Sequence, residues 1–226
     1  MSNYNDIETM MEILVKRTEK IVNEAYSCHK EGKSTRVSKM TSVVFPLYST
    51  DEEDKKVNKK NKTRISEQEL RFAFVQAFQE YKCKHHTNYL YGIEVPTKDK
   101  YLFTIEEEEE DENGNKKKKR KYKPRIDKEN GRSGSFDMVI FNEKLERACL
   151  IEFKYNHPEK GSFAKDFLKL ANLAEGEEKI KRYFIHLMKD KASDEENIKK
   201  NARDGLSVSI ESVIYKPVIL KSKYQQ

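Results

Sequence analysis

The chain has 226 residues, of which 37% are charged and 36% hydrophobic, and its formal net charge is +6. This length allows one α/β domain with a hydrophobic core and a small helical addition. No apolar run reaches the roughly 20 residues of a membrane helix, and the first residues lack a signal-peptide pattern, so we expect a cytoplasmic protein without a membrane partner. Three widely spaced cysteines argue against a disulfide framework and a zinc site.

Residues 4–30 are predicted to form an amphipathic helix within an N-terminal helical element of residues 1–48. The residues of its apolar stripe recur at steps of three and four: Ile7, Met11, Leu14, Thr18, Ile21 and Ala25. The stripe can pack on the rest of the chain or on another subunit, and the spacing does not decide between them. Residues 49–62 follow as a polar loop, because nearly all of their side chains are charged or polar.

A main domain is expected over residues 63–226, and it begins with a helix at Ser66. Ser66 and Glu69 have the spacing of a capping box, in which the side chain of each accepts a hydrogen bond from the backbone of the other. Residues 89–95 are predicted to form the next strand. The buried face of the helix is predicted at Leu70, Ala73, Phe74, Ala77, Phe78 and Tyr81.

Residues 105–122 are predicted to form a charged β-hairpin inserted in this domain. An acidic run and a basic run flank Asn113-Gly114, which is a strong signal for a two-residue turn. Because opposite charges cancel across the hairpin, the basic run is not predicted to be a nucleic-acid patch. A mobile loop is the alternative that the sequence leaves open. The expected cross-strand pairs run from Glu106 with Lys121 to Asp111 with Lys116.

The remaining elements are apolar runs bounded by polar segments. We expect strands at residues 136–141 and 148–154, a helix at 163–174, a strand at 182–188, a helix at 193–204 with Ser193 as its N-cap, and a final strand within 207–220. This order predicts an α/β fold in which helices flank a mixed central sheet.

Charged residues in two neighbouring apolar strands are the main functional signal. Glu152 and Lys154 are two residues apart, so they share one face of their strand. If Phe141 pairs with Ala148 across the connection, Asp137 lies opposite Glu152. The three charged side chains then point toward the same edge of the sheet. An edge-strand salt bridge is the alternative explanation.

Such a carboxylate pair has a chemical use, because two nearby carboxylates repel each other and Mg²⁺ relieves that repulsion. A Mg²⁺ ion held in this way binds a phosphodiester oxygen and lowers the pKa of a coordinated water. Lys154 is placed to hold the attacking water and to offset negative charge that develops on the phosphate.

The arrangement resembles the PD-(D/E)XK nuclease superfamily, which has the restriction-endonuclease-like fold. In that family a helix with a glutamate precedes a strand meander, an Asp opens one strand, and a (D/E)-x-K motif closes the next. Phe136 stands where the family name has Pro. The segments that carry the resemblance are residues 66–81, 92–96, 131–141, 149–155 and 163–170.

The resemblance implies that Asp137, Glu152 and the backbone carbonyl of Phe153 bind Mg²⁺ or Mn²⁺ and that Lys154 is catalytic. It also implies a metal-site glutamate in the first helix. We favour Glu67 for this role, because Glu69 already has a structural role in the capping box.

We therefore expect a magnesium-dependent nuclease, specifically a DNA endonuclease of the restriction or defence type. A homo-oligomer or a partner protein of a defence system is an expected associate. The alternative is a catalytically silent module of the same fold that binds nucleic acid or a protein partner. The sequence does not decide between DNA and RNA or between single and double strands.

Other charged residues give weaker signals. Glu94 has two readings, an acid that supports the metal site or a member of a buried ion pair. Arg132 has two as well, a phosphate contact or a merely exposed side chain. Asp166 and Lys169 are predicted to form an ordinary pair on a helix surface, and His186 is predicted to be a satisfied core histidine.

Overall fold

The computed structural model describes most of the domain and the N-terminal helix. The described residues are 4–30, 42–43, 45, 66–110, 116–155, 160–176, 179–189, 195–203, 206 and 208–221. The predicted polar loop at 49–62 and the predicted N-cap Ser193 lie outside these residues.

A mixed six-stranded open sheet forms the centre of the fold, with the strand order β2-β1-β3-β4-β5-β6. The strands are β1 (Leu90–Glu110), β2 (Lys116–Ile126), β3 (Arg132–Phe141), β4 (Arg147–Tyr155), β5 (Lys181–Lys189) and β6 (Val213–Leu220). The helices are α1 (Tyr4–Lys30), α2 (Glu67–His85), α3 (Lys160–Ala171) and α4 (Glu195–Arg203). Strands β2, β1, β3 and β4 pair antiparallel, whereas β4, β5 and β6 pair parallel.

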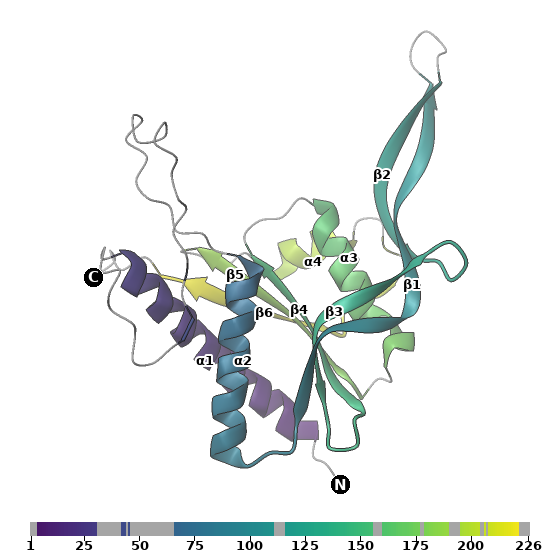
Figure 1. Ribbon diagram of the computed structural model, residues 1–226. Helices are drawn as coiled ribbons and strands as arrows, with labels where there is room; N and C mark the ends of the chain where they lie inside the picture. Colours follow the sequence, from purple (N-terminus) through teal and green to yellow (C-terminus); the bar gives the residue numbers. More distant parts are fainter. Residues whose placement is uncertain are drawn as a thin grey trace, which may run out of the picture.

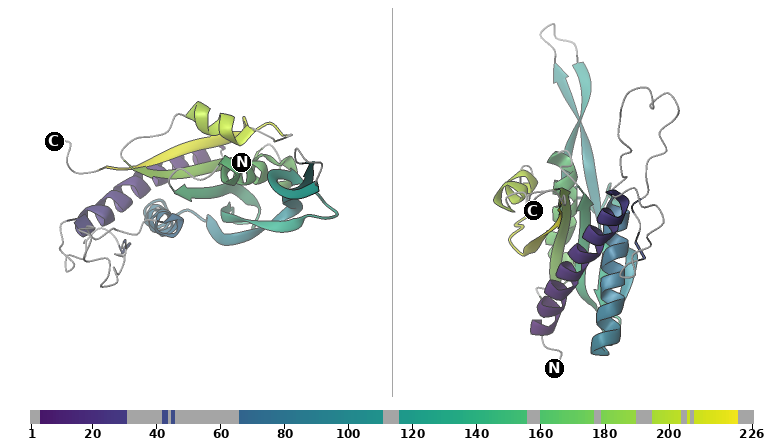
Figure 2. Two further views of the ribbon diagram at one scale, coloured as in Figure 1. Left: turned by 90° about the horizontal axis from the view of Figure 1, so that it is seen from above. Right: turned by 90° about the vertical axis from the view of Figure 1, so that its left-hand side faces the viewer.

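The helices cover the two faces of the sheet, so the fold has three layers (Figures 1 and 2). Helices α1 and α2 lie on one face, and α3 and α4 lie on the other. Each face has its own hydrophobic cluster, because alternate residues of a strand point to opposite faces. The prediction of an α/β fold with a mixed sheet between helices is confirmed.

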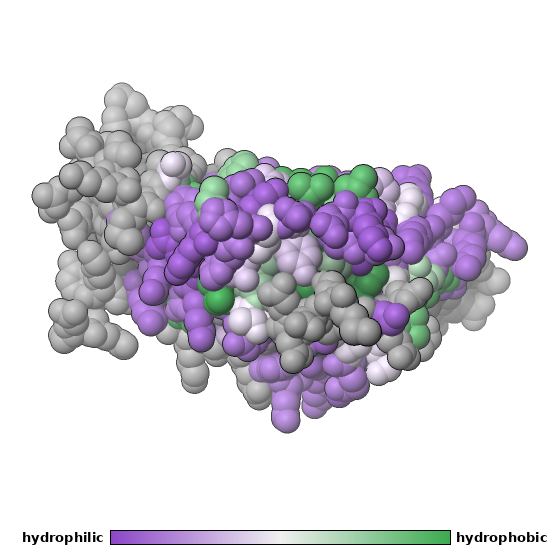
Figure 3. Space-filling model, turned by 90° about the horizontal axis from the view of Figure 1, so that it is seen from below, coloured by the Kyte–Doolittle hydropathy of each residue, from purple (hydrophilic) through white to green (hydrophobic). Residues whose placement is uncertain are grey.

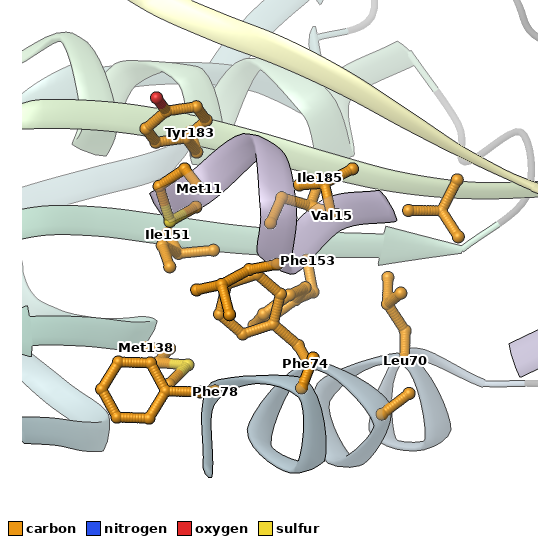
Figure 4. Packing of buried hydrophobic residues seen from close by; sticks show 14 of the residues in the cluster. Met11, Val15, Leu70, Phe74, Phe78, Met138, Ile151, Phe153, Tyr183 and Ile185 are labelled. Atoms are coloured by element: carbon orange, nitrogen blue, oxygen red, sulfur yellow. The ribbon is translucent and has the colours of Figure 1, made fainter. Parts of the chain in front are cut away.

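Helix α1 packs on the same domain through its predicted apolar stripe. All six predicted residues are buried, and they belong to a helix with the predicted bounds. In one cluster, Met11 lies near Tyr183 and Ile151, and Phe153 of β4 lies beside Phe74 of α2 (Figure 4). Asn23 also bonds the backbone of β6, with 2.7 Å from its Nδ2 to the carbonyl oxygen of Ile219.

Helix α2 begins with the predicted capping box. The backbone N–H of Ser66 donates to Glu69 Oε2 at 2.8 Å, and the Ser66 side chain accepts in return. This satisfies two of the N–H groups that a helix start leaves without partners. The six residues of the predicted buried face are all buried.

The β1–β2 hairpin extends away from the body of the protein, as predicted (Figure 1). Its predicted register is wrong by one residue, because Glu110 is the partner of Lys116 and Glu106 is the partner of Arg120. The shift occurs between Leu102 and Thr104, where two residues of β2 stand opposite one of β1. One of the two is Pro124, which has no N–H to donate to the ladder and is therefore favoured at a bulge.

Several other boundaries differ from the prediction. The strand expected at 89–95 continues to Glu110, because it includes one arm of the hairpin. The helix expected at 163–174 ends at Ala171, where Asn172 takes an extended conformation and caps a 3-10 turn, Leu173–Glu175.

The face of the molecule that Figure 3 shows is mainly hydrophilic. Hydrophobic residues appear there only in small groups among the coloured residues (Figure 3). In the described part of the chain, no helix is long and apolar enough to cross a membrane.

We predict that Glu80→Gln lowers the free energy of unfolding by at most about 1 kcal/mol at pH 7 and low salt. Arg17 of α1 donates two hydrogen bonds to Glu80 of α2, at 2.5 and 3.0 Å, and this contact lowers the pKa of Glu80. The stabilisation is therefore present above about pH 4.5 and is lost as the pH falls through the lowered pKa. Urea unfolding at pH 7 and pH 3.5 measures it, and an equal difference at both pH values would contradict the pairing.

Candidate functional site

Strands β3 and β4 bring the predicted acidic residues together. Met138 pairs with Ile151, and one further step in the same register places Asp137 opposite Glu152. The register shift of this ladder lies between Ile140 and Phe141, near the connecting turn, so the acidic end stays in register.

The predicted pairing of Phe141 with Ala148 is wrong, because Phe141 pairs with Arg147 instead. The connecting turn is held by hydrogen bonds between Asn142 and Glu146, and Leu145 adopts a positive φ of 61°. This tight turn changes the register by one residue at its own end of the ladder.

Asp137 links β3 to both β4 and α2. Its Oδ2 accepts a hydrogen bond from the backbone N–H of Phe153 at 2.7 Å, and its Oδ1 forms an ion pair with Arg71 at 2.6 Å. Arg71 also pairs with Glu94 at 2.8 Å. Arg71 was not identified from the sequence, because its role depends on the position of α2 beside β3.

Glu152 is buried against α3. It is only 2% exposed, and its carboxylate is in ion-pair contact with Lys169 of α3. Lys169 is 3% exposed and also pairs with Asp166 at 3.3 Å, while Asp166 is 4% exposed. The prediction of an ordinary surface pair is therefore wrong.

A sequence signal for these two residues does exist. Asp166 and Lys169 lie three residues apart on the side of α3 that carries Phe163, Phe167 and Leu170, all of which are buried. Charges within an apolar helix face indicate a partner in the interior, because unpaired buried charges are costly.

Lys154 lies near the end of β4 and contacts a helix from each of the two helical layers. Its Nζ lies 3.0 Å from Asp166 Oδ2 and 3.3 Å from Glu67 Oε1. Glu67 is in the first turn of α2, whereas Glu69 is occupied by the capping box. The geometry thus places Glu67, and not Glu69, beside the lysine.

Two acidic side chains of the site have raised pKa values, because both are buried in the protein. Burial raises the pKa of Glu152 well above its usual range; Lys169 opposes the shift, whereas Asp166 and Asp137 add to it. Burial also raises the pKa of Glu67, against the attraction of Lys154. An excess of acidic over basic groups at this point favours binding of a cation.

The two lysines remain charged in this environment. Although burial by itself lowers the pKa of Lys154, the attraction of Asp166 and Glu67 raises it above its ordinary value. Burial also lowers the pKa of Lys169, but the attraction of Glu152 and Asp166 raises this pKa above its ordinary value. Both side chains therefore supply fixed positive charge at neutral pH.

Glu94 and Arg132 occupy the rim of the site. Glu94 forms an ion pair with Arg71, as one of its two predicted roles requires. The pair is not buried as that prediction had it, because the Glu94 side chain is 56% exposed. A hydrogen bond from Ser135 at 2.7 Å, helped by Arg71, lowers the pKa of Glu94. Arg132 is exposed at the wall of the same cleft.

One open cleft of about 1060 Å³ is lined by the acidic residues and the two lysines of the site and by Arg132, but not by Arg71. It lies between α3 and the strands β1 and β3, and it reaches from the start of α2 to the base of the β1–β2 hairpin. Glu67, Asp137, Glu152 and Lys154 line it together. His186 lies elsewhere, in the core with its Nδ1 3.1 Å from Tyr215 Oη, so the prediction of a satisfied core histidine is confirmed.

The donor atoms fit a magnesium ion that keeps part of its water shell. In the described ranges, no three His, Cys, Asp or Glu side chains form a metal-holding group. Mg²⁺ needs only one or two carboxylates, and each carboxylate keeps spare acceptor positions after a first hydrogen bond. Glu152 Oε1 is buried in ion-pair contact with Lys169, so a bound metal ion would share or replace this contact.

Comparisons of the chain with protein-family models, with curated proteins and with solved structures found no match. The function of the cleft is therefore inferred from its own geometry and chemistry. The strongest features are the carboxylate pair across β3 and β4 and the lysine that follows on β4.

We predict that Lys169→Met lowers the free energy of unfolding by about 3 kcal/mol, because it leaves Glu152 and Asp166 buried without their shared cation. Chemical denaturation at pH 7 measures this loss. The matched control is Lys199→Met, which removes an i,i+4 pair with the exposed carboxylate of Glu195 on α4 and is expected to cost less than about 0.5 kcal/mol. Equal losses for both variants would contradict the burial of the Lys169 cluster.

Proposed function

We propose that the protein is a nuclease that depends on Mg²⁺ or Mn²⁺ and hydrolyses phosphodiester bonds. The observation that carries the proposal is the register of β3 and β4, which sets Asp137 across from Glu152 and leaves Lys154 in the same cleft. A pair of carboxylates beside a charged lysine suits metal-assisted attack on a phosphate.

The order of elements supports a restriction-endonuclease-like fold within this proposal. Helix α2 precedes the antiparallel strands β1, β3 and β4, and α3 follows them. Asp137 lies in β3, and the sequence Glu152-Phe153-Lys154 lies near the end of β4. The second position is the one that the resemblance to the PD-(D/E)XK superfamily implies, whereas Asp137 lies in the middle of β3 and not at its start.

Each residue has a distinct role in the proposed reaction. Asp137, Glu152 and the backbone carbonyl of Phe153 would hold the metal ion. Glu67, at the start of α2, pairs with Lys154 and would have to leave that lysine to become a further acidic ligand. The bound ion would supply a Lewis acid and lower the pKa of a water. Lys154 orients the attacking water and offsets the charge on the phosphate, and its raised pKa keeps it protonated for this role.

The substrate in this proposal is DNA, and the activity is that of an endonuclease in a restriction or defence role. One cleft contains one carboxylate pair and therefore cuts one strand at a time. Cleavage of both strands would need a homo-oligomer or a partner protein that brings two clefts to the same site.

A second candidate is a catalytically silent module that binds nucleic acid or a protein. It is favoured by the ion pairs that both carboxylates already make, Asp137 with Arg71 and Glu152 with Lys169. These cations neutralise the carboxylates without a metal, so the charge cluster can also serve as a structural unit.

We predict that the wild-type protein nicks or linearises plasmid DNA with Mg²⁺ and that EDTA abolishes the cleavage. Lys154→Ala is expected to lower the rate at least about 100-fold, because it removes a positive charge beside the reacting phosphate. A time course on agarose gels measures both effects. Lys144→Ala is the matched control, since Lys144 is an exposed lysine in the β3–β4 turn.

The two candidates give different results in this assay. Cleavage that survives Lys154→Ala would assign the activity to a contaminant or to another site. A folded wild-type protein that cuts neither plasmid nor linear DNA nor RNA would favour the binding module.

We predict that Asp137→Asn weakens Mn²⁺ binding at least about tenfold, because a neutral amide replaces one of two carboxylates. Isothermal titration with Mn²⁺ in the absence of nucleic acid measures this step apart from cleavage. Glu195→Gln on α4 removes an exposed carboxylate and serves as the control. Equal Mn²⁺ affinity in the wild type and Asp137→Asn would place the metal elsewhere.

A further inference from the structure

The cleft continues beyond the carboxylates to an aromatic wall at the base of the β1–β2 hairpin. Tyr101 and Phe103 of β1 line this end of the cleft, and Asp137 and Glu152 line the other. The proposed chemistry uses only the acidic end. The aromatic end has polar residues at its rim and no role in the proposed metal binding.

A buried network holds the aromatic wall in place. Tyr101 is 1% exposed, and its hydroxyl donates to Glu175 Oε1 at 2.6 Å. Glu175 is fully buried and also accepts hydrogen bonds from the backbone N–H groups of Lys98 and Asp99 at 2.7 and 3.0 Å. The ring of Phe103 is parallel to that of Tyr101, with 4° between the planes and 6.1 Å between the centroids. The hydrogen bonds of Tyr101 therefore hold β1, and with it Phe103, at the wall of the cleft.

Two cations accompany the aromatic wall. Lys165 of α3 places its Nζ 4.9 Å from the centroid of the Phe103 ring. Arg132 of β3 is the strand partner of Tyr101 and lines the same end of the cleft. In the part of the chain that the structure describes, neither cation forms an ion pair with an acidic side chain. They are available to phosphate groups.

We propose that the cleft takes single-stranded nucleic acid, with an unpaired base stacked on Phe103 and the neighbouring phosphates held by Lys165 and Arg132. This inference rests on the proposed nuclease function and narrows the DNA substrate of the same cleft to unpaired segments, which a negatively supercoiled plasmid also exposes. An aromatic ring beside cations is the combination that binds single strands without sequence preference. The base takes the place of Lys165 over the ring and releases its ammonium group to a phosphate.

A paired duplex does not use this wall. Its bases are stacked inside the helix, so none can reach Phe103 while its phosphate lies at Asp137 and Glu152. An unpaired base has free faces and can enter the cleft with its own backbone. Single-stranded DNA and RNA share this chemistry, and the experiment below separates them.

Fluorescence anisotropy with a labelled single-stranded 12-mer tests the proposal, with Ca²⁺ in place of Mg²⁺ to hold the phosphate without turnover. Phe103→Leu is expected to weaken binding roughly tenfold, because it keeps an apolar side chain and removes the stacking face. Phe103→Tyr keeps the ring and is expected to bind as the wild type does. Phe72→Leu is the matched control, since Phe72 is 58% exposed on α2 and lies outside the cleft lining.

The outcomes separate this inference from the proposed function. Loss of single-strand binding in Phe103→Leu, with duplex binding unchanged, supports the inference even if the wild type cuts nothing. DNA and RNA 12-mers in parallel show which strand is preferred. Equal single-strand affinity for wild type and Phe103→Leu, or tighter binding of duplex by the wild type, overturns the inference and leaves the nuclease function standing if Mg²⁺-dependent cleavage is seen.

Discussion

The burial of charge at the centre of the sheet is the constraint on which the rest of the structure depends. Glu152 lies in the buried middle of β4, between Ile151 and Phe153, and is 2% exposed. A carboxylate in such a place costs several kcal/mol unless a counter-charge reaches it. Lys169 of α3 supplies that charge, so α3 has to pack with its charged side chains toward the sheet. The cleft lies at this polar part of the contact.

The same charges join three layers at one end of β4. Arg71 binds Asp137 from α2, while Lys154 reaches Glu67 of α2 and Asp166 of α3. The backbone of Phe153 donates to Asp137 and completes the connection between β3 and β4. A site shared by helices and strands is positioned by the hydrophobic packing behind it, which holds its geometry better than a loop does.

Strand β1 connects the two ends of the cleft. At Glu94 it takes a positive φ of 53°, between two residues that stay in register with β3, and the Glu94 side chain lines the cleft. Farther along, Glu175 fixes Tyr101 and so sets the position of Phe103. The buried acid of the 3-10 turn thus supports the wall of the cleft from behind.

The sequence by itself determined the type and order of the main elements and the position of Asp137 opposite Glu152. Periodicity was sufficient for α1, α2 and the sheet strands, and apolar strands with isolated charges indicated Asp137, Glu152 and Lys154. Only the tertiary structure decided the roles of Arg71, Asp166 and Lys169, because a helical charge has a surface or an interior role according to what packs against it. It also decided the hairpin register, which depends on a bulge at Pro124 that uniform runs of like charge could not reveal.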